Sequence, residues 1–271
     1  MENDDVIITS AFRTAIGSLN GSLSSKTAPE LGSVVIKKCI ENSGLKKKEV
    51  DMVYMGQVLS AGVGQNPARQ ASILAGLSNE TTNTTVNQVC GSGLASIALA
   101  YNAIRCGDSN IIIAGGQESM SNAPHYIKLR KGEKINEDKI KDSMIIDGLW
   151  DVYNKYHMGM TAENVAKKFS IKREDQDKFA LNSQKKAIKA IKEKKFINEI
   201  VPVEINNNMT INLIIRGYHL HWLRKATVHQ NLEMYSYNAE TVYPSPKNEL
   251  YHLTHASYQN PHFGPEPEAS I

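Results

Sequence analysis

The 271-residue sequence has few cysteines and no long apolar run. Its three cysteines, Cys39, Cys90 and Cys106, are too few and too irregularly spaced for a disulfide framework or a structural zinc site, so we expect three reduced thiols. No apolar stretch approaches the roughly 20 residues of a membrane span, and the acidic start MENDD lacks the basic region of a secretion signal. These absences favour a soluble, cytoplasmic protein.

An excess of charge of either sign is also missing. The 31 Lys and Arg residues nearly balance the 28 Asp and Glu residues, which leaves a net charge of +3, and the lysines are scattered along the chain. Binding to nucleic acids or membrane surfaces usually requires a concentrated basic patch. We therefore expect neither a nucleic acid nor a membrane as a partner.

Aspartate is absent from residues 206–271, whose composition differs from that of residues 1–205. The later segment holds 9 charged residues and 2 glycines, against 50 and 16 before it, but it carries 6 of the 8 histidines. Its turn residues follow no regular periodicity, and its histidine pairs lack carboxylate or cysteine partners at ligand spacing. We predict an irregular tail without a metal site, which a changed reading frame or an alternative exon would explain.

Before residue 206, strand-like runs alternate with helical patterns. The predicted strands are Val6–Ser10, Met52–Met55, Thr84–Asn87 and Asn110–Ala114. The predicted helices run from near Pro29 to just before Gly44, from Asn66 to Leu74 and from about Ser92 to Cys106. Strands separated by crossover helices are typical of a mainly parallel sheet that is covered on both faces. The predicted fold class is therefore α/β, with a mixed, mainly parallel sheet and a buried helix.

From Gln117 onward the pattern becomes irregular and rich in lysine. Helices are predicted over Thr161–Phe169 and over residues 173–194, followed by a strand at Ile200–Val203. One stripe of the longer helix carries Phe179, Ala180, Ser183, Ala187 and Ile191, and its many charged residues are predicted to face solvent. We divide the chain into an amino-terminal core (1–117), a loop region (118–205) and the tail (206–271).

Cys90 stands where the third predicted strand ends and the predicted buried helix begins. Its neighbours Gly91 and Gly93 allow close backbone approach and leave N–H groups near the sulfur. The helix is small or apolar nearly all round, so we expect it to be buried, with its positive end stabilising a Cys90 thiolate. Such a strand-to-helix turn resembles a nucleophile elbow, although a small buried cysteine is an equal alternative on these grounds. Cys39 and Cys106 lie within apolar helical faces and are predicted to be inert.

Five motifs in the same order resemble segments of the thiolase family, the acyl-CoA acetyltransferases that make or cleave 3-ketoacyl-CoA. These motifs are ITSAFRTAIGSLNGSL, GQVLSAGVGQNPARQAS, NQVCGSGLASI, AGGQESMSNAPH and DGLWDVYNKYHMGMTAENVA. The resemblance covers residues 1 to about 205. It implies a thiolase-like amino-terminal domain over residues 1–117 and a CoA-binding loop region, part of the family's loop domain, over residues 118–205.

The resemblance also implies roles for four residues. Cys90 matches the nucleophile that takes an acyl group from acyl-CoA, and Leu149, His157 and Met158 match positions lining the pantetheine and acyl pocket. The pattern HMG at residues 157–159 is that of thiolases acting on acetoacetyl-CoA. The implied reaction is the reversible condensation of two acetyl-CoA molecules in lipid metabolism. It implies a homo-oligomer and no cofactor other than the coenzyme A thioester substrate.

Residues after 205 resemble nothing in the family's second half, which supplies an activating histidine, an oxyanion hole and a second cysteine. We therefore expect a truncated chain that does not turn over alone and that exposes apolar surface where the second half would pack. Two alternatives remain: a catalytically inactive thiolase fold or interaction module, and a ketoacyl-synthase-like condensing enzyme. The motifs HMGMTAENVA and GQNPARQA favour a thiolase over a synthase.

Overall fold

A computed structural model describes residues 5–132, 134–205, 210 and 211. The chain divides into two units, Met1–Arg216 and Gly217–Ile271, and all described residues belong to the first. The predicted tail lies outside the described residues except for Thr210 and Ile211. These two residues form β9 (Thr210–Ile211), which pairs antiparallel with β8 (Val203–Glu204).

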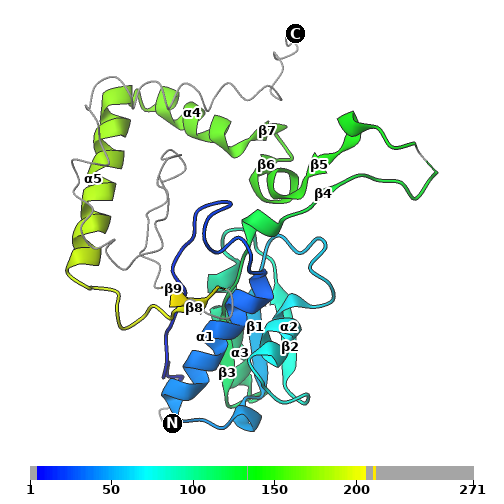
Figure 1. The fold of residues 1–271 in the computed structure, drawn as a ribbon, viewed down its shortest axis with the longest axis vertical. Helices are drawn as coiled ribbons and strands as arrows, with labels where there is room; N and C mark the ends of the chain where they lie inside the picture. The colour runs from blue at the N-terminus through cyan, green and yellow to red at the C-terminus, as the bar shows by residue number, and fades with distance from the viewer. Residues whose placement is uncertain (1–4, 133, 206–209, 212–271) are drawn as a thin grey trace. The chain divides into compact units, whose positions relative to one another are not determined.

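Three parallel strands form the central sheet (Figure 1), in the order β2 (Thr82–Val86), β1 (Met52–Gly56) and β3 (Ile112–Gly116). The register places Gly56, Val86 and Gly116 side by side. All three strands therefore end at the same edge of the sheet, and the segments that follow them meet there. The predicted α/β class and parallel sheet are confirmed.

Three helices pack with the sheet, and each begins and ends close to where the sequence predicts: α1 (Ala28–Ser43), α2 (Pro67–Leu74) and α3 (Ser92–Cys106). α1 starts at a capping box formed by Thr27 and Glu30, and α2 starts at the cap Asn66. α1 and α3 end at Gly44 and Gly107, which adopt the left-handed conformation. A short 3-10 turn, η1 (Lys47–Glu49), leads into β1.

The apolar core lies where α1 and α2 pack against β1. Its buried members are Ile36, Ile40, Val50, Val53, Met55, Ala68, Ala71, Ala75 and Leu77. Each large aliphatic side chain that is fully buried there contributes roughly 1.5–3 kcal/mol to stability. Because β2 and β3 lie on opposite sides of β1, right-handed crossovers put α2 and α3 on opposite faces of the sheet.

The prediction that α3 is a buried helix is wrong for the described part of the chain. The side of α3 that faces the sheet is lined by small residues, and the Ser96 hydroxyl donates to the Gly115 carbonyl at 2.7 Å. The other side is open: Leu94 is 75% exposed, and Ile97 and Tyr101 are exposed as well. The described residues place no second layer over this side. Exposed apolar surface is what we expected for a chain without the family's second half.

The predicted strand at Val6–Ser10 does not form. Ile7 and Ile8 are 74% and 78% exposed, because a β-branched run makes a strand only beside a partner and the described residues place none there. The amino-terminal segment is tied down further along, where Arg13 pairs with Ile200 in an isolated bridge. Arg13 Nε lies 2.6 Å from Glu199 Oε1. The predicted strand at Ile200–Val203 is reduced to this bridge and β8.

Residues 117–199 form short elements before two longer helices. The short elements are η2 (Met120–Asn122), β4 (His125–Tyr126), η3 (Glu137–Lys139), β5 (Lys141–Asp142), the π-helical η4 (Met144–Leu149), β6 (Trp150–Asp151) and β7 (Tyr156–His157). β4 pairs with β5 and β6 pairs with β7, both antiparallel. The helices are α4 (Met158–Lys168) and α5 (Arg173–Lys192).

The two longer helices follow the sequence pattern with two differences. α4 begins three residues before the predicted start because the His157 side chain caps it. No residue of α5 is fully buried: most of its predicted stripe is half-buried, but Phe179 is exposed. Within the described residues, no helix has the length and apolar character needed to cross a bilayer.

The first turn of α3 sits directly on β1 at Gly56. A Cβ atom at Gly56 would lie 2.5 Å from the Ser92 carbonyl carbon and 2.6 Å from the Gly93 nitrogen. Both are backbone atoms, so they cannot rotate away as a flexible side chain would. Gly56 is therefore the residue that allows α3, and the cysteine before it, to sit at the sheet edge.

We expect Gly56→Ala to lower the free energy of unfolding by about 1–3 kcal/mol, because the added methyl group overpacks this contact. Urea denaturation measures the change. Gly115→Ala is the matched control, since a Cβ at Gly115 meets nothing nearer than Met55 Sδ at 3.9 Å. Equal stability losses in the two variants would contradict the proposed contact.

Candidate active site

Cys90 occupies a tight turn between β2 and α3. The residue before it, Val89, has a φ of 50°, which is unfavourable for a β-branched residue. Hydrogen bonds hold the turn: the Gly91 N–H donates to the Gln88 carbonyl at 3.0 Å, and the Ser92 N–H donates to the Val89 carbonyl at 3.1 Å. The Ser92 hydroxyl accepts from the Gln88 N–H at 2.9 Å and donates to the Val89 carbonyl at 2.6 Å. This strained backbone supports the resemblance of the turn to a nucleophile elbow.

The Cys90 thiol is exposed and lies at the amino-terminal end of α3. Gly91 is the cap residue of the helix, and no side chain caps it. The first N–H groups of a helix carry partial positive charge, which stabilises a nearby anion such as a thiolate. The geometry therefore offers an accessible sulfur next to the positive end of a 15-residue helix.

The other two thiols have different surroundings. Cys39 is half-buried, and burial raises the pKa of its thiol despite a hydrogen bond from the Phe12 backbone. Cys106 is exposed, so the prediction that it lies in a covered apolar face is wrong, for the same reason that α3 is not buried. The two exposed thiols thus lie at opposite ends of one helix, with Cys106 at the carboxyl end.

Buried amide groups join the strand ends behind the turn. The Gln57 N–H donates to the Val86 carbonyl at 2.9 Å, and the Gln117 N–H donates to the Gly56 carbonyl at 2.8 Å. The two glutamine side chains also bond to each other, with Gln117 Nε2 donating to Gln57 Oε1 at 2.9 Å. The sequence analysis singled out neither glutamine, because a buried amide pair between segments 60 residues apart leaves no local pattern.

Glu118 follows β3 and holds the segment after β1. Its Oε2 accepts hydrogen bonds from the backbone N–H groups of Val58 at 2.8 Å and Leu59 at 3.3 Å. Its Oε1 is buried and has no hydrogen-bond partner among the described residues. Burial raises the pKa of the Glu118 carboxyl, and the backbone N–H groups that donate to it oppose this shift.

Leu149, His157 and Met158 come together at a second place, the hairpin of β6 and β7. Leu149 precedes Trp150, which pairs with His157, and Met158 begins α4. His157 Nδ1 accepts a hydrogen bond from the Gly159 N–H at 2.9 Å. Leu149 and His157 are half-buried and Met158 is exposed. Cys90 is held by a different part of the structure, the turn after β2.

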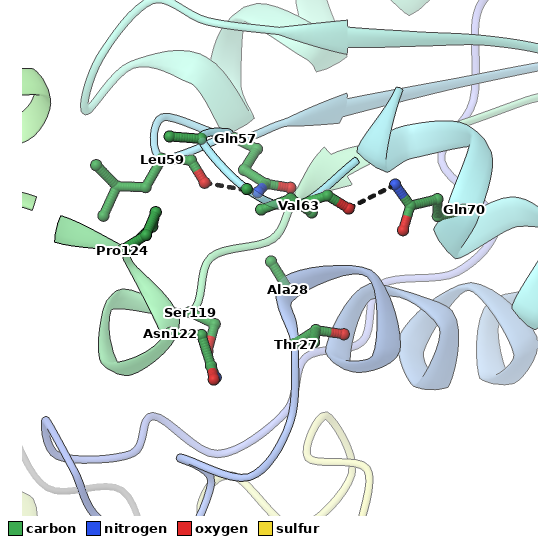
Figure 2. Close-up of a pocket in the computed structure, with 11 residues that line it drawn as sticks. Thr27, Ala28, Gln57, Leu59, Val63, Gln70, Ser119, Asn122 and Pro124 are labelled. Carbon is green, nitrogen blue, oxygen red and sulfur yellow. Dashed lines mark hydrogen bonds between the residues drawn. The ribbon is translucent and has the colours of Figure 1, made fainter. Parts of the chain in front are cut away.

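A small pocket lies between the strand edge and the start of α1 (Figure 2). Its volume is about 270 Å³, and polar side chains such as Gln57, Gln70 and Asn122 line it together with Leu59 and Thr27. Gln57 Nε2 donates to the Leu59 carbonyl, and Gln70 Nε2 donates to the Val63 carbonyl, both at 2.9 Å. None of the four site residues predicted from the sequence lines this pocket. In the described residues, no group of three or more His, Cys, Asp or Glu is placed to bind a metal ion.

Comparison with known proteins identifies the family. Residues 6–221 match the family described as "Thiolase, N-terminal domain", a range that extends past the compositional break after residue 205. This match confirms the thiolase resemblance over the alternative of a ketoacyl-synthase-like enzyme.

Curated relatives agree with this match. The chain is 58% identical over 202 residues to the acetyl-CoA acetyltransferase of Cupriavidus necator, and 54% identical over 202 residues to that of Pseudomonas aeruginosa. Each of these alignments covers 74% of this chain and 51% of the relative. A probable acetyl-CoA acetyltransferase of Escherichia coli is 50% identical over 205 residues, which are 75% of this chain and 52% of that protein. The chain thus spans about half the length of the curated relatives it matches.

We expect Glu118→Gln to become more stable relative to the unchanged chain as the pH rises from 4 to 7. A carboxyl whose pKa is raised by folding contributes most stability below its unfolded pKa, and this contribution is lost as the pH rises through the folded pKa. Glutamine does not titrate, so the variant does not lose this contribution. Urea denaturation of both proteins at several pH values measures the difference. The free energy of unfolding of the variant minus that of the unchanged chain should therefore rise with pH. If this difference stays constant or falls, burial does not destabilise the ionised carboxyl.

Proposed function

Because the chain belongs to the thiolase family through its N-terminal domain, we propose that it carries the acyl-accepting half of an acetyl-CoA acetyltransferase. The curated relatives bear that name. The observation that carries the proposal is the exposed Cys90 thiol, raised on a strained turn beside the uncapped start of α3. The substrates would be acetyl-CoA and acetoacetyl-CoA.

In the first half-reaction, the Cys90 thiolate attacks the carbonyl carbon of acetyl-CoA. A carbon–sulfur bond forms while the carbonyl electron pair moves onto oxygen, and the tetrahedral species then expels the coenzyme A thiolate. The expelled thiolate takes up the proton that the cysteine lost. The products are an acetyl thioester on Cys90 and free coenzyme A. The helix end favours this step because it stabilises the attacking thiolate.

Condensation needs a further group, a base that removes a proton from the methyl carbon of a second acetyl-CoA. The described residues contain two histidines, and neither is placed in the Cys90 turn: His125 lies on the β4–β5 hairpin and His157 on the β6–β7 hairpin. We propose that the base and the oxyanion donors belong to the half of the relatives that this chain does not span. Without them, the complete reaction is expected to slow by a factor of about 10⁴ or more.

We also propose that residues 118–205 form the coenzyme A-binding loop region. Leu149, His157 and Met158 would line the pantetheine and acyl pocket there, and this is supported by their gathering at one hairpin. A Cβ at Gly148 would lie 3.6 Å from Leu59 Cδ2, so the base of the hairpin lies near the segment that follows β1. The complete enzyme would be a homo-oligomer that needs only its thioester substrate. Three free thiols are compatible with a reducing compartment such as the cytosol.

We expect acetyl-CoA to acetylate Cys90 and no other cysteine, with release of one coenzyme A per chain and without formation of acetoacetyl-CoA. Cys90 alone combines exposure with a position at a helix N-terminus. Intact-mass and peptide mass spectrometry detect the thioester, and a thiol assay detects free coenzyme A.

Two variants provide the controls. Cys90→Ala should abolish acetylation, whereas Cys106→Ala should leave it unchanged, because Cys106 lies at the opposite end of α3. Acetylation of Cys106 at the same rate as Cys90, or none at all on the chain, would refute the proposed role. Sustained acetoacetyl-CoA formation would show that a catalytic base had been missed.

A further inference from the structure

We infer that Asn87 is a positioning residue for Cys90: its side chain fixes the left-handed Val89 to the strand edge and thereby sets the direction of the thiol. The inference rests on the proposed role of Cys90 as nucleophile. Asn87 is the first residue after β2 and lies three positions before the cysteine.

One end of the Asn87 side chain holds the turn. Its Oδ1 accepts a hydrogen bond from the Val89 N–H at 2.9 Å, two residues further along the chain. Valine is disfavoured at a φ of 50° because its branched Cβ crowds the backbone there. A hydrogen bond that forms in this conformation offsets part of that cost. It therefore favours the backbone in which Cys90 projects from the end of the sheet.

The other end of the same side chain is anchored to the neighbouring strand. Asn87 Nδ2 donates to the Val58 carbonyl at 3.3 Å, and the Val58 N–H in turn donates to Glu118 Oε2 at 2.8 Å. Val58 follows β1 and Glu118 follows β3. These side-chain hydrogen bonds follow the strand order β2, β1, β3. They continue the hydrogen bonding between the strands just beyond the ends of the sheet. Hydrogen bonds thus connect the Cys90 turn to the segments that follow all three strands.

Asn87 is an exposed residue, so its effect on the position of Cys90 can be measured apart from its effect on the stability of the fold. Its two hydrogen bonds lie at the surface, so their removal leaves no buried polar group unsatisfied and should cost the fold little. What is lost is the restraint on Val89. Thiol reactivity at Cys90 should therefore respond more strongly to this residue than does the free energy of unfolding.

The test compares the alkylation rates of Cys90 and Cys106 by limiting iodoacetamide in the full chain, read by peptide mass spectrometry. Both thiols are exposed, Cys90 just before α3 and Cys106 at its end, so the ratio of their rates cancels changes that loosen the whole helix. We expect Asn87→Ala to lower the Cys90 to Cys106 ratio about fivefold, the effect of one typical net hydrogen bond. Asn87→Ser should retain part of the ratio, because a serine hydroxyl can accept the same N–H.

Two further variants make the test specific. Asn83→Ala is the matched control, since Asn83 lies on β2, the strand that leads to Asn87, but its side chain donates to the Thr81 carbonyl, and it should leave the ratio unchanged. In a Val89→Gly background, Asn87→Ala should have a smaller effect, because glycine adopts positive φ without help. Urea denaturation of each variant checks that stability does not account for the result.

An unchanged ratio in Asn87→Ala would overturn the inference. So would an equal loss in Asn83→Ala, or an Asn87→Ala effect that is undiminished beside Val89→Gly. The inference and the proposed function fail separately, because the alkylation ratio uses no coenzyme A. A ratio that depends on Asn87, in a chain that acetyl-CoA does not acetylate, would support the positioning role and refute the acyltransferase proposal.

Discussion

The contact between the first turn of α3 and the end of β1 determines where Cys90 stands. At Gly56 the helix backbone comes so close to the strand that there is no space for a Cβ atom, whereas a Cβ at Gly93 would meet Gly116 only at an ordinary contact distance of 3.8 Å. The contact at Gly56 therefore places the start of α3 at the edge where three parallel strands end. The chain must then leave β2 and enter α3 within a few residues. The strained conformation of Val89 and the exposed thiol after it follow from that short connection.

α3 is apolar on two sides, but the described chain covers only one of them. Its sheet side is closed by small residues such as Ser96 and Ala100, whereas Leu94 and Ile97 face outward. Apolar side chains in this arrangement indicate a helix suited to a layer above it as well as below. Cys90 lies at the end of the same helix. A covering layer would therefore exclude water from the thiol and, by lowering the local dielectric, strengthen its interaction with the helix end.

Locally encoded features could be predicted from the sequence, and features that depend on distant partners could not. Gly44, Asn66 and Gly107 end or begin helices through their own conformational preferences and capping bonds, so the bounds of α1, α2 and α3 follow from short segments. The run Val6–Ser10 has strand composition but needs a neighbouring strand. The hydrogen bonds of Asn87 to Val89 and Val58 could not be predicted, because valine at positive φ contradicts its conformational preference and because Val58 and Glu118 lie far from Asn87 in sequence.

The proposed reaction has two parts, preparation of the nucleophile and proton transfer, and the described residues account for the first. The features that prepare a nucleophile are an exposed sulfur, a helix end and a fixed turn, and residues 52–118 supply all three through local elements and one sheet edge. Proton transfer at the carbon of a second acetyl-CoA requires a base placed opposite the thioester, and neither described histidine lies in the Cys90 turn. The N–H groups at a helix start favour a nearby anion, and α3 supplies such a start, whereas a base has to come from residues other than the two described histidines. The proposed acyl transfer to Cys90 therefore draws on these described elements, whereas the proposed condensation needs a base that neither described histidine places beside the turn.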